Sequence, residues 1–594
     1  MQKIVRAILV SGIGLFAIFF SLQSLAPSKS VDNAIKLPKF VSTPLDSIVT
    51  QPTADISDQP FQDNLNIYKD DAPGSVVTVY ITVRKGNSAD NTDHTWKQVN
   101  DFSNGVFTNN APVQDESAEA IVQFGDDRGP IPGELGYDEV VPNATIGVRG
   151  PLSYPQQSYT IKINQGSGKW RGQSTIALNK HFLDPSRLRN KLNFDLMKQI
   201  PNMVSLRTQF VHLYIMDQTT DSWSKAFVDY GLYTQVEVPD KKFLKSRFLD
   251  PSGQLYKAAF FDFGRYPDQI RLVDDPLFDE SLFSTRLEIK GNQDNSKLIQ
   301  MLDDVNNPEI PIEATFEKYF NADNYFTWMA YNILVGDVST SSTNFYLYSP
   351  HNSNKFYFIP WDYDDSFFRQ NRVNCCDYSP YASYEYGVAN YWGSHLTNRV
   401  LKISAYRQAL DSKINELMEF LTPQKIIAML ADYKPVVEKY SFQMPDALYL
   451  PINKVEFEQD LKIIPSEVKN NYALYLESVK TSMPFHLSAP IVANGILTFK
   501  WGESYDFNAQ AVAYHFVIAR DPALNDVLID KMLSNATSIQ VAQLMPGEYF
   551  WGVTAINESG KIQFPYDTFL DSNNVPHPGV KVFYITPEGE LLEK

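Results

Sequence analysis

The fold is decided by two neighbouring segments, residues 336–348 (GDVSTSSTNFYLY) and residues 359–367 (IPWDYDDSF). Aromatic and apolar residues dominate 344–348 and 356–360, which predicts two short strands joined by a turn. Asn344 opens the first strand, and Asp362 follows directly after the second. A hairpin would therefore bring these two side chains together, although eighteen residues separate them.

This order of groups indicates a metal site. An amide oxygen and a carboxylate, placed by a hairpin, are what protein kinases use to hold Mg²⁺ against nucleotide phosphates. We therefore predict that the side-chain oxygens of Asn344 and Asp362 lie within about 5 Å, because one cation binds each ligand at roughly 2.0–2.6 Å. The alternative is a solvated acidic turn at 362–365, although the apolar residues on both sides of it favour a partly buried turn.

The N-terminus indicates export. Lys3 and Arg6 precede an apolar run that ends in a small-x-small pattern at Ala26, so residues 1–26 are predicted to be a signal peptide or an uncleaved membrane anchor. Residues 27–69, rich in Ser, Pro, Asp and Thr, are expected to be a flexible linker. The formal charge of −17 argues against a nucleic-acid partner, whose phosphates need basic residues. The adjacent cysteines 375 and 376 suit neither a relaxed disulfide nor a zinc site, and we expect an idle pair.

Two folded domains are expected after the linker. Residues 70–483 mix strand patterns, as at 75–84, 144–149, 158–163 and 210–216, with helical patterns, as at 188–200, 324–334, 406–420 and 423–433. Residues 484–594 contain short alternating strands, with aromatic residues at Trp501, Tyr514 and Trp551. This C-terminal pattern resembles a fibronectin type III or immunoglobulin-like β-sandwich, a type of module that binds partners or acts as a spacer.

The larger domain resembles the CotH kinase family of spore-coat and cell-surface proteins. The resemblance runs in order from about residue 70 to residue 482, and its motifs are Arg149-Gly150, Ser158-Tyr159, Leu178-Asn179, Leu188-Arg189-Asn190, Asp229–Tyr233 with Glu237, Asn344-Phe345-x-Leu347-Tyr348 and Trp361-Asp362-x-Asp364. It implies an α+β fold with a divergent protein-kinase-like domain. It also implies that ATP and Mg²⁺ are bound and that phosphate is transferred to serine on a protein.

The resemblance also assigns roles to individual residues. Asn344 and Asp362 match the metal-binding pair, and Asp364 matches a supporting acid. Arg149 and Glu237 are expected near the nucleotide, with an exposed glutamate at a strand end as the alternative for Glu237.

The sequence departs from the family's pattern at two places. The catalytic aspartate of such kinases stands five residues before the metal-binding asparagine, where this chain has Ser339, and the nearest acid is Asp337. Relatives are lysine-rich where this chain reads Gln156-Gln157. Lys162, on the same strand face as Ser158, is a candidate replacement for the phosphate-binding lysine, with a solvated surface lysine as the alternative.

These observations leave two functional hypotheses. The first is an exported atypical serine kinase that acts on coat, envelope or secreted proteins. The second is a catalytically silent pseudokinase at the cell surface, whose sandwich binds a protein or a glycan. Other enzyme classes have little support, because the sequence has no His-x-x-x-His pair, no Gly-x-Ser-x-Gly elbow and no complete phosphate-binding loop; residues 165–169 fit a hairpin turn.

Overall fold

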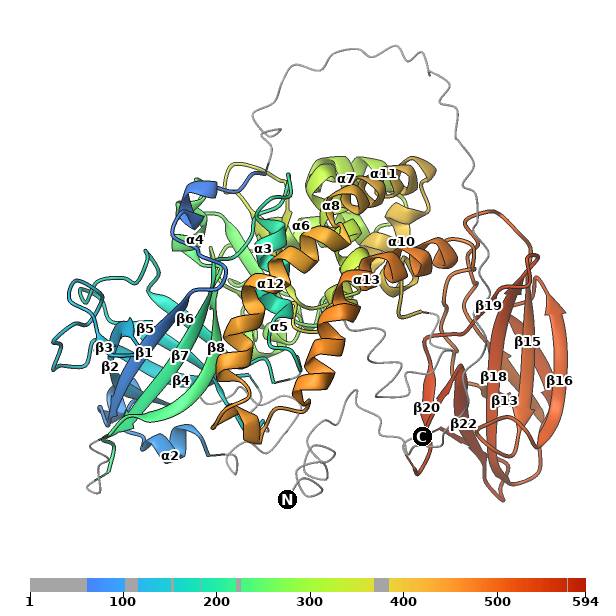
Figure 1. Cartoon of the computed structure of the whole chain (residues 1–594). Coiled ribbons are helices and arrows are strands. Elements are labelled where there is room, and N and C mark those ends of the chain that lie inside the picture. The colour runs from blue at the N-terminus through green and yellow to red at the C-terminus, as the bar shows by residue number, and fades with distance from the viewer. Residues whose placement is uncertain are drawn as a thin grey trace, which may run out of the picture.

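The computed structural model describes residues 61–101, 116–150, 154–182, 184–220, 226–367, 384–573 and 575–593. The predicted signal peptide, most of the predicted linker and the cysteine pair lie outside these residues. From blue to red, Figure 1 shows a group of strands, a mostly helical lobe and a second group of strands. The predicted α+β class, with an all-β region at the C-terminus, is confirmed. Within these ranges no helix has both the length and the hydropathy to cross a bilayer.

The first sheet closes into a barrel. Its strands are β1 (Val76–Arg84), β2 (Ser117–Asp126), β3 (Gly129–Pro130), β4 (Ala144–Arg149), β5 (Ser158–Ile163), β6 (Thr175–Asn179), β7 (Thr208–Asp217) and β8 (Val228–Glu237). They follow the order β1-β7-β8-β6-β5-β4-β2-β3, and β1 also pairs with β2. The β1–β7 pairing is parallel, whereas the other pairings are antiparallel. Closure satisfies the backbone groups that an open sheet would expose at its edges.

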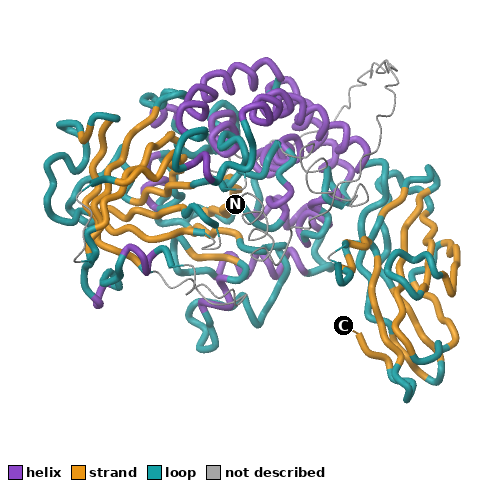
Figure 2. Tube along the Cα trace, turned by 60° about the horizontal axis from the view of Figure 1, so that its bottom comes forward, coloured by secondary structure: helices purple, strands orange, loops and turns teal. Residues whose placement is uncertain are grey.

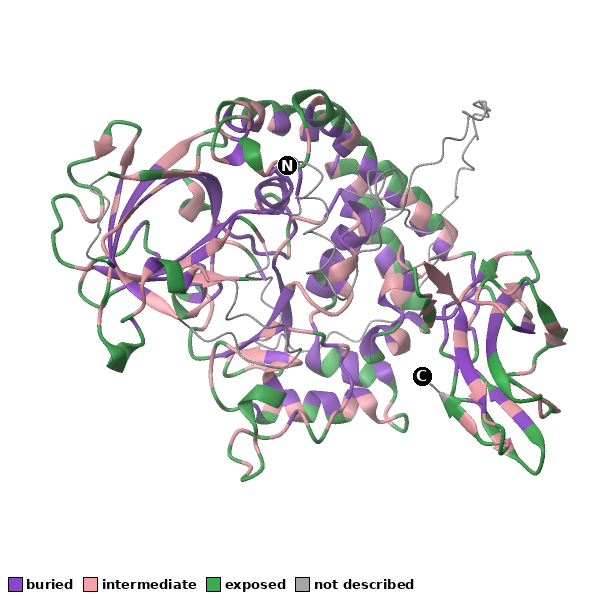
Figure 3. Cartoon of the chain, turned by 90° about the horizontal axis from the view of Figure 1, so that it is seen from below, coloured by how far each residue is buried: buried purple, intermediate pink, exposed green. Residues whose placement is uncertain are grey.

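The barrel interior is a packed apolar core. Along β5, Tyr159, Ile161 and Ile163 are buried, whereas Lys162 is exposed. The inward side chains of β5 join those of other strands, such as Val79 of β1, in one cluster. Figure 3 shows the buried faces of these strands in purple. Because apolar side chains fill the barrel, a polar ligand would have to bind outside it.

The helical lobe contains a second sheet, in the order β10-β9-β11-β12. The strands of this sheet are β9 (Gln254–Ala258), β10 (Leu287–Ile289), β11 (Phe345–Ser349) and β12 (Tyr357–Pro360). The helices of the lobe include α3 (Arg189–Met197), α4 (Lys241–Ser246), α5 (Glu280–Ser284), α6 (Ser296–Asn306), α7 (Ile312–Tyr319), α8 (Ala322–Val335), α10 (His395–Leu401), α11 (Ser404–Phe420), α12 (Pro423–Tyr440) and α13 (Lys454–Ser478). A short helix, α2 (Trp96–Val99), precedes the barrel strand β2.

Helix α8 leads the chain into the candidate site. It contacts β12, α11 and α13, and it is buried on all sides, as expected for a helix with apolar residues all round. It ends at Gly336, whose φ of 70° is the left-handed conformation that terminates many helices and that glycine adopts without strain. The chain therefore turns sharply after α8, directly before Asp337.

The C-terminal domain consists of two packed sheets. The smaller contains β13 (Ile491–Ala493), β14 (Ile496–Lys500) and β17 (Ser538–Ala542), and the larger contains β15 (Val512–Ala519), β16 (Val527–Ser534), β18 (Gly547–Asn557), β19 (Ile562–Gln563), β22 (Val580–Ile585) and β23 (Leu591–Glu593). A separate two-stranded ribbon is formed by β20 (Thr568–Leu570) and β21 (Pro576–Pro578). Phe499 of the smaller sheet packs on Trp551 and Phe583 of the larger, with ring centroids 4.9 and 5.5 Å apart. The assignment to the fibronectin type III family stays a prediction.

The C-terminal domain is docked on the helical lobe, as Figure 2 shows from a second direction. Trp392 stacks on Tyr505 with ring centroids 5.5 Å apart, and the Ser504 hydroxyl donates to the Met483 carbonyl at 2.6 Å. Lys561 pairs with Glu477 at 2.5 Å. These contacts fix the orientation of the two domains.

Candidate active site

The β11–β12 hairpin brings Asn344 and Asp362 to the same end of the sheet. Phe345 pairs with Pro360, and the Trp361 N–H donates to the Asn344 carbonyl at 3.2 Å. Asn344 and Asp362 both have left-handed backbone conformations, with φ of 57° and 53°. Such values are uncommon outside glycine, although Asn and Asp adopt them more readily than other residues, and they cluster at functional sites. The 5 Å separation of their side-chain oxygens stays a prediction.

Asp362 lies in a cluster with Asp364 and His181. One potential ligand atom from each residue lies within 4.8 Å of the other two. Burial and the neighbouring Asp364 carboxylate raise the pKa of Asp362 to about 6, against the opposing effects of His181, Arg149 and, last, Lys257. Two carboxylates so close repel each other, and a bound cation would remove that repulsion.

Asn190, from α3, fixes the arrangement of the cluster. Its amide oxygen accepts from the Tyr363 N–H at 3.2 Å. Its amide nitrogen then faces Asp362 Oδ1 and His181 Nε2, each at 3.4 Å. Because His181 Nε2 accepts from this amide, the ring proton belongs on Nδ1, which faces Asp364 Oδ2 at 3.4 Å. His181 thus orients Asp364 and serves as its hydrogen-bond donor.

These donor groups fit Mg²⁺. The ion prefers oxygen ligands and is commonly bound through one or two carboxylates together with substrate phosphates. Asp362 and Asp364 would supply the carboxylates, and Asn344 at the hairpin end would supply an amide oxygen. The buried donor behind Asp364 is the type of partner that holds a metal-binding carboxylate in place.

The loop after α8 contains the predicted catalytic positions. Asp337 is 1% exposed and caps the short 3-10 helix Val338–Ser341. Its Oδ1 accepts from the Ser339 N–H at 3.2 Å and from the Ser339 hydroxyl at 2.5 Å. The Asn344 amide donates to the same hydroxyl at 2.7 Å. Ser339 therefore stands between Asp337 and Asn344, and its hydroxyl links the buried Asp337 carboxylate to the Asn344 amide.

Arg149 is brought to the cluster, whereas Lys162 is not. The Arg149 guanidinium lies over the Trp361 ring, 5.5 Å from its centroid. Burial lowers the pKa of Arg149, and the Asp362 carboxylate counteracts this effect. Arg149 of β4 lies opposite Ser158 of β5, and Lys162 lies four residues further along β5. At about 3.3 Å per residue, Lys162 is therefore roughly 13 Å from Ser158. Lys162 is exposed there, on the outside of the barrel.

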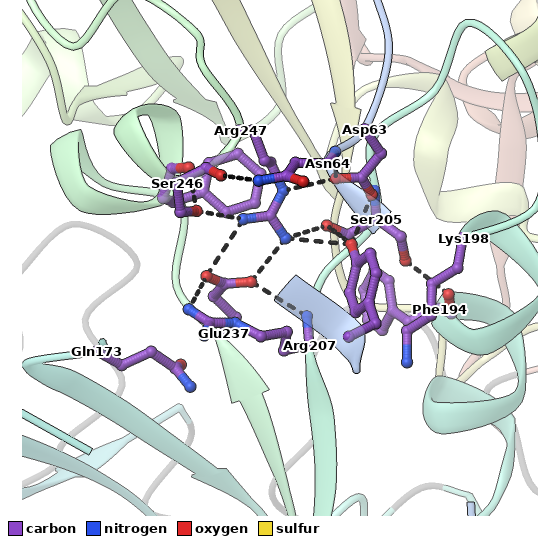
Figure 4. Close-up of polar contacts among 12 residues, drawn as sticks. Asp63, Asn64, Gln173, Phe194, Lys198, Ser205, Arg207, Glu237, Ser246 and Arg247 are labelled. Atoms are coloured by element: carbon purple, nitrogen blue, oxygen red, sulfur yellow. Dashed lines mark hydrogen bonds and ion pairs between the residues drawn. The ribbon is translucent and has the colours of Figure 1, made fainter. Parts of the chain in front are cut away.

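Glu237 belongs to a buried ion network, shown in Figure 4. Its carboxylate is 2.5 Å from Arg207 Nη2 and 2.7 Å from Arg247 Nη2. Burial would raise the pKa of Glu237, but Arg247 and Arg207 outweigh it and lower that pKa to about 2. Glu237 is only 2% exposed, so the alternative of an exposed strand-end glutamate is wrong. Its carboxylate instead links the barrel to Arg247 at the end of α4, and Arg247 Nε in turn pairs with Asp63 Oδ1 of the N-terminal segment at 3.1 Å.

The sequence reasoning missed three residues at or near the cluster. Lys180 and His181 follow β6 directly, and polar residues just after a buried strand were the available signal. Lys180 is buried and pairs with Asp446 at 2.6 Å, and burial lowers the pKa of Lys180 to about 8. His181 has no sequence pattern that links it to Asp362, whereas Asn190 belongs to the Leu188-Arg189-Asn190 motif, from which no role for it was inferred.

The fold and the site define a two-lobed α+β protein with a carboxylate cluster between a β-barrel and a helical lobe. A family described as CotH kinase protein matches residues 146–475, more than half of the chain. The chain therefore belongs to the CotH kinase protein family, as its motifs predicted. It is similar to inner spore coat protein H of Bacillus subtilis (strain 168), with 24% identity over 359 residues, which cover 58% of this chain and 89% of that protein.

Proposed function

We propose that this protein is an exported atypical kinase that binds ATP with Mg²⁺ and transfers phosphate to serine hydroxyls of coat, envelope or secreted proteins. The observation that supports this most is the cluster of Asp362, Asp364 and His181, which is held by Asn190 and follows the hairpin whose first strand begins after Asn344. The spore-coat name of the similar Bacillus protein supports an acceptor and a location outside the cytoplasm.

In this proposal, each residue of the cluster has a role. Asp362, Asp364 and Asn344 hold Mg²⁺, which when bound neutralises and orients the phosphates. His181 fixes the direction of the Asp364 carboxylate through its Nδ1–H. Arg149 adds positive charge on the barrel side of the site.

The path of the proton limits the rate. An acceptor serine must lose its proton as it attacks phosphorus, and here a hydroxyl rather than a carboxylate stands at the expected place. Ser339 Oγ can take that proton only while it passes its own to Asp337 Oδ1, 2.5 Å away. A positioned general base contributes roughly 10²–10⁴-fold to such reactions. We therefore expect bound nucleotide and slow transfer.

The second candidate function is a silent surface protein. The observation that favours it is also Ser339, because in this loop the acidic side chain of Asp337 is buried and the half-buried Ser339 offers a hydroxyl instead of a carboxylate. The docked C-terminal domain would then bind a protein or a glycan partner.

The two functions are separated by a transfer assay with radiolabelled ATP, Mg²⁺ and a serine-containing protein acceptor. We expect low incorporation by the native chain and a gain for Ser339→Asp, up to roughly 10²-fold, since that change restores a carboxylate at the base position. Ser341→Ala, in the same loop, is the matched control and should leave incorporation unchanged. Failure of both the native chain and Ser339→Asp to transfer any label would favour the silent protein.

A further inference from the structure

The second sheet carries a row of charged residues on the face next to the cluster. Glu288 of β10 stands directly opposite Lys257 of β9, and Lys257 stands directly opposite Tyr346 of β11. Directly opposed residues of antiparallel strands project from the same face and are neighbours. Glu288, Lys257 and Tyr346 therefore form a row across three strands.

At the Tyr346 end, this row approaches the cluster of Asp362, Asp364 and His181. The Tyr346 ring packs edge-on against Trp361, with centroids 5.4 Å apart. Trp361 lies under the Arg149 guanidinium and directly precedes Asp362. Lys257 and Arg149 both act electrostatically on the Asp362 carboxylate. The site thus has two cations, one from the barrel and one from the second sheet.

Lys257 of the row and the neighbouring Lys290 are partly open to solvent. Lys257 Nζ is 3.2 Å from Glu288 Oε1, Lys290 Nζ is 2.6 Å from Glu288 Oε2, and these three side chains are 32–39% exposed. Burial would raise the pKa of Glu288, but the charges of Lys257 and Lys290 outweigh it and lower that pKa. Glu288 is thus ionised and neutralises only one of the two lysines, so a net positive charge remains beside the carboxylate cluster.

A simple surface ion pair would be the plain explanation of such a row, and pairs of this exposure contribute little to stability. Two features indicate a role in ligand binding beyond such a pair. The positive charge lies next to a group of carboxylates suited to a metal ion, and a phosphate chain bridges these two kinds of partner in phosphoryl-transfer sites. The other candidate lysine, Lys162, is at the far end of β5.

We propose that Lys257, held in place by Glu288, is the phosphate-binding lysine of this site, and that its ligand is the polyphosphate chain of a nucleotide. Lys290 keeps the pair positively charged. A lysine of the second sheet thereby takes over the role expected of a barrel lysine. This inference deepens the proposed function and rests on it for the nucleoside part of the ligand; the affinity for polyphosphate rests on the row itself.

The test is calorimetric titration of the full chain with ATP, tripolyphosphate and adenosine, each with Mg²⁺. Lys257→Met should weaken ATP and tripolyphosphate about 10- to 100-fold, because one charge-assisted hydrogen bond is lost. Adenosine affinity should not change. Lys162→Met is the matched control and should bind all three ligands as the native chain does. Lys257→Gln is a second variant in case Lys257→Met does not fold.

Each outcome decides the matter. If the native chain binds ATP and both Lys257 variants bind it equally well, the assignment of Lys257 is wrong while the proposed nucleotide site stands. Weaker binding by Lys162→Met would also overturn it. If the native chain binds no ATP, the proposed function fails, yet tripolyphosphate binding that is lost in Lys257→Met would still identify the row as a polyphosphate site. A melting temperature lowered without any loss of affinity would show that Lys257 is merely structural.

Discussion

Replacing Glu237 by Gln separates a structural role from a role in nucleotide binding. The change keeps the size of the side chain and removes its charge, so the guanidinium groups of Arg207 and Arg247 lose their shared counter-ion. Removing one partner of a buried ion pair typically costs about 3–5 kcal/mol when the other charge stays buried without compensation; the low end of this range applies here, because Arg247 keeps its pair with Asp63 at 3.1 Å.

The pKa of Glu237 gives an independent magnitude. It falls from an ordinary value of 4.5 to about 2 in the folded chain. At about 1.36 kcal/mol per pKa unit, this corresponds to roughly 3 kcal/mol of stability. Because the folded-state pKa is the lower one, this contribution is fully present above pH 4.5 and is lost as the pH falls towards 2. The native chain and Glu237→Gln should therefore differ in stability at pH 7 and become similar near pH 2.

Calorimetric melting of the full chain measures this effect. With roughly 2.1 cal/mol/K of unfolding entropy per residue, a loss of about 3 kcal/mol lowers the melting temperature of the larger domain by about 4 °C. Glu416→Gln, which breaks the exposed pair with Lys413, is the control and should change it by less than about 1 °C. An unchanged melting temperature together with weaker ATP binding would refute the reasoning and place Glu237 at the nucleotide.

Two further predictions concern the cluster and the C-terminal domain. His181→Ala removes the donor that orients Asp364, so we expect Mg²⁺ affinity, measured by titration without nucleotide, to fall about 10- to 100-fold; an unchanged affinity would contradict the role of His181. Deleting residues 484–594 should leave a fragment that still melts cooperatively, although at a lower temperature, because Trp392 and Glu477 lose Tyr505 and Lys561; a broad, non-cooperative melt would contradict this prediction.

Local patterns in the sequence predicted the elements well. The strands expected at 144–149 and 158–163 coincide with β4 and β5, and the expected hairpin matches β11 and β12 to within one residue at each boundary. Alternation of apolar residues and short turns carries this information locally. The closure of the barrel was not predicted, because the pairing of β1 with both β2 and β7 joins segments far apart in the sequence.

The site was only partly predictable for the same reason. Asn344 and Asp362 belong to one hairpin, so their spacing indicated a common site. His181 meets Asp364 across 183 residues, and a search for closely spaced histidine pairs could not find it. Lys257 is recognisable only from strand pairing in the second sheet. The environment of Glu237 is set by its burial and by its ion pair with Arg247. A position at the end of a strand reveals neither of these.

We propose that Asp362 holds the metal ion through which ATP is bound, and calorimetric titration with ATP measures this binding. We expect the native chain to bind ATP in the presence of Mg²⁺ and to lose most of that affinity when the ion is chelated. Asp362→Ala should lose it in either condition, since it lacks a metal ligand, while Ser341→Ala, whose native hydroxyl donates locally to the Val338 carbonyl, should bind ATP normally. The account would be contradicted if the native chain did not bind ATP with Mg²⁺, or if Asp362→Ala bound it as tightly as the native chain.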